Sequence, residues 1–301
     1  MLITLLSGGL VSLVYDVGNM SWQLLVAISV VTFSVSVILR RILLYKDKSD
    51  PIAYVIVFQG LVGVVTGVYA LIHGFDMPDF SKYWFAITIT CVLYALGNVF
   101  CAKALQLVEA SAFSVLFASS AIWTILVGSW VLGDGLTVTH IAGISLVLMS
   151  VVVLNMKKGS LKLNLGVVLS LITSVLFGLA VVGWTYVARH ADVPTWTSVS
   201  FLVPALMVLA IKPKAVQKMK PFLDKRILIT MLILGVVYSI SALTSLFAYR
   251  DGNVNLVAAL QQVSIILTTV LGIFFLNERK DLLRKIVAAC TCLVGVLLIV
   301  K

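Results

Sequence analysis

The sequence predicts an all-α, polytopic membrane protein built from two inverted repeats of five helices each. Its 301 residues are 61% hydrophobic and only 11% charged, with a mean hydropathy of +1.14. This leaves too few polar side chains to cover a water-soluble domain. The hydrophobic pattern of residues 20–154 also recurs over residues 164–298 at a constant offset of 144 positions, without a gap. Such self-similarity indicates two copies of one unit.

The equivalent positions are spread over the whole unit, so the offset does not depend on one short motif. The pairs are Phe33/Phe177, Tyr94/Tyr238, Ala104/Ala248, Leu116/Leu260, Ser120/Ser264, Thr124/Thr268, Gly128/Gly272 and Leu132/Leu276. We therefore expect a first repeat at residues 20–157 and a second at residues 164–301, preceded by a hydrophobic extension, residues 1–19.

Ten apolar runs meet or approach the roughly 20 residues that a helix needs to cross a hydrocarbon core of about 30 Å. Their apolar residues are continuous rather than alternating, which favours helices over barrel strands. In the first repeat we expect helices at 22–44, 52–73, 83–105, 111–132 and 141–154, and in the second at 165–188, 195–211, 227–249, 255–276 and 286–300.

An odd number of helices per repeat places the end of the first unit on the opposite side of the membrane from its start. The second unit must then be inverted. Inverted repeats are typical of secondary transporters, which bind substrate near the bilayer midplane and alternate access by rocking one half against the other. The pattern alone therefore favours transport.

Residues 108–154 and 252–299 resemble the helix, Gly-Glu turn, helix pattern of the ten-helix, EamA-type members of the drug/metabolite transporter superfamily. Gly133-Asp134 and Asn277-Glu278 fall where that turn is expected. The resemblance extends over nearly the whole chain from Met20 and implies an exporter. The family often has a proline about 13 positions before the acidic turn residue, where this chain has Ala121 and Ile265. The sequence therefore gives no proline that would break either fourth helix.

The charged residues exclude several classes of function. All twelve Asp and Glu residues and the three His residues lie at helix ends or in loops, which disfavours a carboxylate-coupled exporter of hydrophobic cations. No HExxH motif, paired intramembrane aspartates or P-loop is present, so we expect neither an enzyme nor a cofactor. The basic residues lie between hydrophobic runs, where they report membrane orientation rather than nucleic-acid binding.

The polar and aromatic side chains expected at mid-membrane depth are uncharged. Buried amides and phenols need hydrogen-bond partners in lipid. Interhelical bonds, worth about 0.6 kcal/mol each, are one explanation, and the aromatic residues could instead face lipid. As the substrate site at the midplane between the repeats we select Gln59, Tyr94, Asn98, Trp123, Trp184, Tyr238, Gln261 and Gln262.

A neutral, aromatic cavity suits a small amphipathic metabolite, either amino-acid-like or aromatic. The expected protein is thus an exporter of such compounds in the cell membrane, as in a bacterial inner membrane. Its partners would be a small-molecule substrate and membrane lipid, with no nucleic acid, and it would act as a monomer or homodimer. Two alternatives remain open: a lipid-carrier flippase subunit, which needs a lateral opening between helices, and a non-transporting membrane scaffold, which does not need amides at mid-depth.

The distribution of basic residues predicts the orientation of the chain. If the loops after the odd-numbered helices are cytoplasmic, they hold all of the 22 Lys and Arg except Lys82, Arg189, Arg250 and Lys301. The positive-inside rule then places Lys301 outside the cytoplasm, whereas the related exporters are generally pictured with both ends inside. A topology reporter fused after Lys301 should behave as non-cytoplasmic, and a cytoplasmic signal would overturn this orientation.

Residues 1–19 have no counterpart in the second repeat. They are apolar through Tyr15 but too short for a confident span, and they lack the basic start and cleavage site of a signal peptide. Met20-Ser21-Trp22 resembles a natural start for the family, so the segment is either an upstream-start artefact or an interfacial helix outside the transport core. A chain beginning at Met20 should transport normally. Loss of transport at unchanged expression would contradict this.

Overall fold

The computed structural model describes residues 20–46, 49–133, 138–157, 160–161, 163–278 and 281–300. Residues 1–19 and Asp134, for which the sequence made predictions, lie outside the described residues. The described chain is helical apart from a short antiparallel hairpin between the repeats, formed by β1 (Met156–Lys157) and β2 (Ser160–Leu161). The expected all-α class is confirmed.

The helices follow the expected runs closely. The first repeat contains α2 (Trp22–Arg41), continued by the π-helix η2 (Ile42–Lys46), then α3 (Pro51–His73), α4 (Phe80–Leu107), α5 (Ala110–Phe117), α6 (Ser120–Val131) and α7 (Val138–Asn155). The second contains α8 (Leu165–Ala188), α9 (Val193–Ile211), the 3₁₀ helix η3 (Pro213–Leu223), α10 (Lys225–Asp251), α11 (Val254–Gln261), α12 (Ser264–Leu276) and α13 (Leu282–Val300).

Eight segments of the described chain are long and apolar enough to cross a membrane, four from each repeat. Two of them combine consecutive helices, α5 with α6 and α11 with α12. The last helix of each repeat, α7 and α13, is not among the eight, and these two helices pack against each other. The expected count of ten membrane helices is therefore supported in part.

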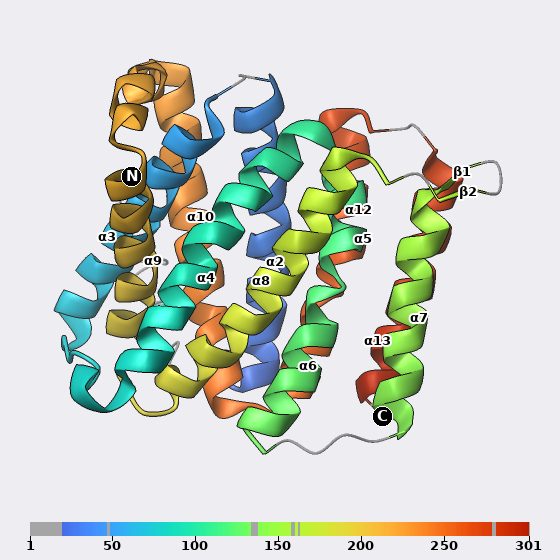
Figure 1. Ribbon diagram of the computed structural model, residues 1–301, viewed down its shortest axis with the longest axis horizontal. Helices are drawn as coiled ribbons and strands as arrows, with labels where there is room; N and C mark the ends of the chain where they lie inside the picture. The colour runs from blue at the N-terminus through green and yellow to red at the C-terminus, as the bar shows by residue number, and fades with distance from the viewer. Residues whose placement is uncertain are drawn as a thin grey trace, which may run out of the picture.

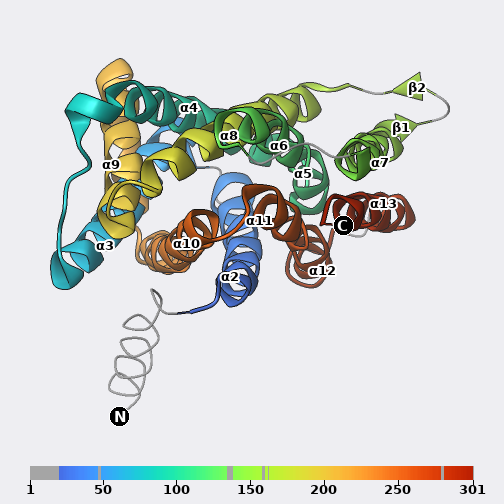
Figure 2. The same ribbon diagram turned by 90° about the horizontal axis from the view of Figure 1, so that it is seen from below.

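The two repeats are inverted and interleaved. Figure 1 shows α2 running from the lower to the upper end of the bundle and its counterpart α8 running the other way. Seen along the helices in Figure 2, α4, α8 and α5/α6 form one row, and α10, α2 and α11/α12 form a second row facing it. Contacts between α4 and α8 and between α2 and α10 join helices of different repeats within each row. The pairs α3/α9 and α7/α13 close the two sides.

Small residues allow this close packing. A Cβ atom added to Gly63 of α3 would lie 2.6–2.9 Å from atoms of Leu202 on α9, and one added to Gly67 would lie 2.8 Å from Ser198 Oγ. Ser198 Oγ in turn donates a hydrogen bond to the Gly63 carbonyl oxygen at 2.8 Å. The G-x-x-x-G pattern of α3 thus serves close helix contact, as is common in membranes.

The fourth helix of each repeat is broken, although neither break contains a proline. The interruptions lie at Ala118-Ser119 and at Gln262-Val263, which the 144-residue offset makes equivalent. At each break the backbone turns tighten from the α pattern to three-residue spacing, as in the bonds from Ala121 N to Ala118 O and from Ile265 N to Gln262 O. The expected fourth helices 111–132 and 255–276 correspond to the spans Ala110–Val131 and Val254–Leu276, which these short 3₁₀ turns interrupt without a proline.

The connections after α2, α4, α7, α9 and α12 all lie at the upper end of the bundle in Figure 1, which we call the basic end. Exposed lysines of η3 lie here, and Lys218 pairs with Asp50 at 2.8 Å. Burial acts to raise the pKa of Asp50, but hydrogen bonds from Lys218 and the first turn of α3 outweigh it and hold the pKa below its ordinary value. Asp50 therefore stays ionised as the cap of α3.

A buried carboxylate joins the two repeats at the basic end. After α12 ends, Asn277 adopts a left-handed conformation (φ 56°, ψ 37°), which asparagine tolerates. The next residue, Glu278, is only 6% exposed and caps α5 of the first repeat. Its oxygens accept hydrogen bonds from Ala110 N at 2.8 Å, Ser111 N at 3.0 Å and Ser111 Oγ at 2.6 Å. A negative group at a helix N-terminus is favourable.

Lys285 of α13 completes this junction. Its ammonium donates to the Glu278 carbonyl oxygen at 3.1 Å and forms an ion pair with Glu109, the residue preceding α5. The turn between α12 and α13 is thus joined to the start of α5 by the hydrogen bonds of Glu278 and by the ion pair between Lys285 and Glu109.

Replacing Glu278 with glutamine should lower the stability of the folded protein by about 1–2 kcal/mol, because an amide loses the charge interaction with the helix N-terminus and one acceptor. Thermal unfolding in detergent micelles measures the effect. Asp251→Asn is the matched control, since it makes the same chemical change in a surface pair with Arg250 and should alter stability by less than about 0.5 kcal/mol. Equal unfolding temperatures for the two variants would contradict the proposed cap.

Candidate functional site

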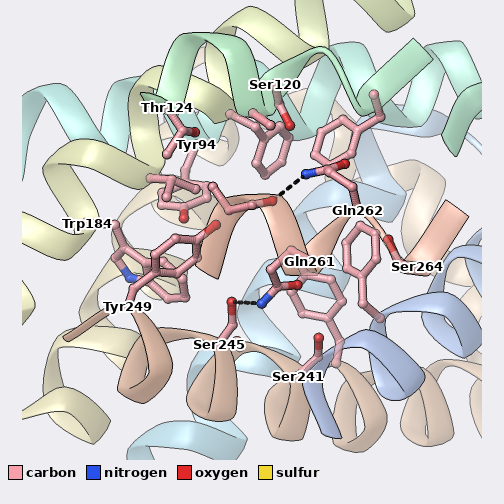
Figure 3. A pocket seen from close by; sticks show the side chains of 18 of the residues that line it. Tyr94, Ser120, Thr124, Trp184, Ser241, Ser245, Tyr249, Gln261, Gln262 and Ser264 are labelled. Atoms are coloured by element: carbon pink, nitrogen blue, oxygen red, sulfur yellow. Dashed lines mark hydrogen bonds between the residues drawn. The ribbon is translucent and has the colours of Figure 1, made fainter. Parts of the chain in front are cut away.

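A cavity of ≈ 100 Å³ lies between the two rows of helices, at the level of the broken helices. A cavity of this volume has room for several water molecules. It draws on helices of both rows and both repeats, and its lining contains no charged residue (Figure 3). The lining residues are Phe33, Tyr94, Ser114, Phe117, Ser120, Ala121, Thr124, Phe177, Val181, Trp184, Phe201, Tyr238, Ser241, Ala242, Ser245, Tyr249, Ala258, Gln261, Gln262 and Ser264.

Aromatic rings form a continuous wall of this cavity. Tyr94 meets Trp184 edge-on, with ring centroids 5.7 Å apart, and Tyr238 meets Phe201 in the same way at 5.8 Å. Phe201 also lies 5.9 Å from Tyr94, so that it joins the two symmetry-related tyrosines. Edge-to-face contacts of this kind are stabilising and hold rings in fixed orientations. The wall is therefore a shaped apolar surface with phenol groups at its edge.

Polar side chains gather on the side of the cavity away from Trp184, where Figure 3 shows Gln261, Gln262 and Ser264 among further aromatic rings. Gln261 Nε2 donates hydrogen bonds to Ser29 Oγ at 2.8 Å and to Ser245 Oγ at 2.9 Å. Gln262 Nε2 donates to the Ala258 carbonyl oxygen at 3.0 Å, one turn earlier. Gln261 thus has both of its N–H donors engaged by protein, and Gln262 has one. Their side-chain oxygens accept no hydrogen bond from the described residues and are available to a donor on a solute.

Five of the eight site residues expected from the sequence line this cavity: Tyr94, Trp184, Tyr238, Gln261 and Gln262. Trp184 is held by a hydrogen bond from its Nε1 to Ser200 Oγ at 3.0 Å. The three others lie elsewhere. Their contacts show why.

Gln59 and Asn98 contact the backbone of Tyr94 and do not line the cavity. Gln59 Nε2 lies 3.5 Å from the Tyr94 carbonyl oxygen, and Asn98 Nδ2 donates to the same atom at 3.0 Å. Both residues are fully buried. Trp123 is on the outer side of α6, with its side chain 37% exposed, which is the lipid-facing alternative considered for the aromatic residues. The structure therefore does not bring these three residues to the cavity.

Sequence reasoning missed several lining residues. Tyr249 is the last residue of the expected helix 227–249, and Phe201 has neither a polar atom nor an aromatic counterpart, since the equivalent position is Val57. Phe33, Phe177 and Ser120 were visible as members of symmetric pairs. Symmetric pairing was thus a usable signal for cavity residues that was applied only to Tyr94 and Tyr238.

The interpretation of every basic residue as belonging to the loops was wrong for Arg40 and Arg41. Both belong to α2, inside a membrane span, and only 2% and 6% of their surfaces are exposed. Arg41 lies over the Tyr45 ring and donates to the Leu105 carbonyl oxygen. Arg40 lies over the ring of Tyr238, a cavity residue, with its Cζ atom 5.7 Å from the ring centroid. The η2 segment continues the helix beyond these arginines, so both lie within the candidate span Trp22–Tyr45.

The site has the features of solute binding rather than of bond-breaking chemistry. Its lining offers hydroxyl, amide and aromatic groups without a general acid or base. Among the described residues, no group of three or more His, Cys, Asp or Glu side chains could hold a metal ion.

Comparisons with known proteins agree with this fold. One of 28 matching chains of solved structures, titled "Crystal structure of protein", aligns with a TM-score of 0.65 over 90% of this chain and 96% of its own length. At 16% sequence identity this likeness concerns the fold alone. No curated protein matches the chain.

The model of the EamA-like transporter family matches residues 20–156 and again residues 164–301. These two matches together include nearly the whole chain beyond residue 19. The chain is therefore a member of the EamA-like transporter family, in the drug/metabolite transporter superfamily, and a multi-pass membrane transporter rather than an enzyme.

Proposed function

We propose that this transporter exports small amphipathic metabolites, amino-acid-like or aromatic compounds, by alternating access at the cavity between the two rows of helices. The observation that carries the proposal is the cavity lining itself. It combines an aromatic wall with free amide and hydroxyl oxygens at the level where both fourth helices break. Binding sites for small organic ligands have this composition, mostly apolar with a few convergent polar groups.

The three tyrosine hydroxyls at the cavity support a role in solute contact. Those of Tyr94, Tyr238 and Tyr249 make no hydrogen bond to any described residue, although their side chains are at least 92% buried. Buried phenols normally find a partner. Here the available partner is water or a solute in the cavity.

The small cavity volume also bears on mechanism. Pockets for drug-sized ligands enclose several hundred Å³, so a cavity of ≈ 100 Å³ must widen to hold an aromatic solute. Widening is expected of a transporter that alternates between states. Export, rather than uptake, follows from the family resemblance.

The test is transport by the purified full-length protein in proteoliposomes, with a panel of labelled amino acids and aromatic compounds. Tyr94→Ala and Tyr238→Ala should each lower transport at least tenfold, about 1.4 kcal/mol of lost interaction, while the protein remains folded. Tyr→Phe at either position separates the hydroxyl contribution from the ring.

Trp130→Ala is the control for removing a large aromatic side chain, because Trp130 is 86% exposed on the outer surface of α6. Ser145→Ala, on an exposed face of α7, controls for loss of a hydroxyl. Both should transport like the parent protein. The proposed site fails if both tyrosine-to-alanine variants fold and transport like the parent across all accepted solutes.

A further inference from the structure

Arg40 is a permanently charged group inside a membrane span that none of the site chemistry above uses. It follows Phe33 by seven residues on α2, so the two side chains lie on one face of the helix about 10 Å apart. The Tyr238 ring lies between them, with its centroid 6.5 Å from that of Phe33 and 5.7 Å from Arg40 Cζ. Arg40 is therefore one layer from the cavity, toward the basic end.

The protein compensates this charge only with neutral groups. The Arg40 guanidinium lies over the Phe58 ring at 4.9 Å and donates from Nη2 to Asn98 Oδ1 at 3.3 Å and Cys101 Sγ at 3.2 Å. Its Nε is buried and has no acceptor at hydrogen-bond distance in the described part of the chain, and the neutral Tyr54 hydroxyl is a further close neighbour of the guanidinium. No described carboxylate forms an ion pair with it.

The adjacent arginine shows the contrast. Arg41 faces the junction at the basic end, where the carboxylates of Glu278 and Glu109 are its charged neighbours. Two consecutive arginines thus have opposite surroundings: Arg41 has anions within electrostatic reach, and Arg40 has none among the groups it contacts.

An arginine cannot shed its proton to relieve this situation. Removing an ion from water is costly even after relaxation, and cation–π contacts return only part of that cost. The largest remaining source of compensation is an anion. A planar guanidinium can donate two parallel hydrogen bonds to a carboxylate, and the unpartnered Nε–H of Arg40 would supply one of them.

The second repeat has different residues at the positions equivalent to Arg40 and Asn98. Counting 144 residues on from Arg40 gives Trp184, which lines the cavity, and counting on from Asn98 gives Ala242. One end of the site therefore has a cation with its supporting amide, and the other has an indole ring. Such a site distinguishes the two ends of a solute.

We infer that the transported solute carries a carboxylate group, which binds the Arg40 guanidinium when Tyr238 and Phe58 move apart, while its apolar part remains near Trp184. This inference rests on the proposed function and narrows it to monocarboxylates, amino acids included. Neutral or purely cationic aromatic compounds would not be substrates.

Matched acids and amides test the inference. Phenylacetate and phenylacetamide have the same shape and differ in charge, and phenylalanine and its amide form a second pair. Each compound is titrated against the full-length protein, with the fluorescence of Trp184 and the other tryptophans as the signal, and is then used to compete with uptake of labelled phenylalanine into proteoliposomes. The acids should bind at least tenfold more tightly than the amides.

Variants then assign the preference to Arg40. Arg40→Gln should lower affinity for the acids at least tenfold and leave the amides unchanged, and Arg40→Lys should restore part of the difference. Arg41→Gln removes the same charge one residue later and should keep the full acid preference. The comparison of acids with amides on the unmodified protein stands even if Arg40→Gln does not fold.

Equal affinity of the unmodified protein for acids and amides would overturn the inference and leave the proposed function intact, provided that solutes are still transported. An acid preference that survives in folded Arg40→Gln would also overturn it. Failure of the folded protein to bind or transport any compound of the wider panel would overturn both the inference and the proposed function.

Discussion

The interleaving of the two repeats is the constraint on which the cavity depends. Each wall contains helices of both repeats, with α8 packed between α4 and α6 in one row and α2 between α10 and α12 in the other. Neither repeat alone would enclose the polar groups that lipid cannot solvate. A rocking movement that preserves the extensive α4/α8 and α2/α10 contacts must therefore move one row against the other. The moving bodies would then be rows of mixed origin rather than the repeats themselves.

The broken fourth helices place the polar groups inside this frame. In the second repeat the break follows Gln261 and includes Gln262, and the tightened turns carry both amides to the cavity. Backbone groups near the breaks find side-chain partners: Ser119 Oγ donates to the Leu116 carbonyl oxygen, and Ser34 Oγ donates to that of Ser264. The membrane requires such partners wherever a helix departs from regularity. Serine hydroxyls therefore satisfy backbone carbonyl groups where the helices are irregular.

The sequence predicted the helices well because a long, continuous apolar run in lipid satisfies its backbone hydrogen bonds by forming a helix. It predicted the cavity less well, since depth in the membrane does not say which way a side chain faces. Trp123 and Trp184 were expected at similar depth, yet one faces outward and the other lines the cavity. Arg40 was counted with the basic loop that follows the expected helix 22–44, although it lies inside that helix, and the structure buries it there.

The positions at which the two repeats differ are as informative as those at which they agree. Even an identical pair has different surroundings: a Cβ atom added to Gly272 would lie 2.9 Å from Glu278 Oε2, whereas one added to Gly128 would be in ordinary contact with Val254. At the site the repeats agree at Phe33/Phe177, Tyr94/Tyr238 and Ser120/Ser264. They diverge where Arg40 is equivalent to Trp184 and Phe117 to Gln261. Two identical walls would present the same groups to both ends of a solute. A compound with one charged and one apolar end can be held in a single orientation only if the walls differ, so divergence at these positions is what recognition of an amphipathic solute requires.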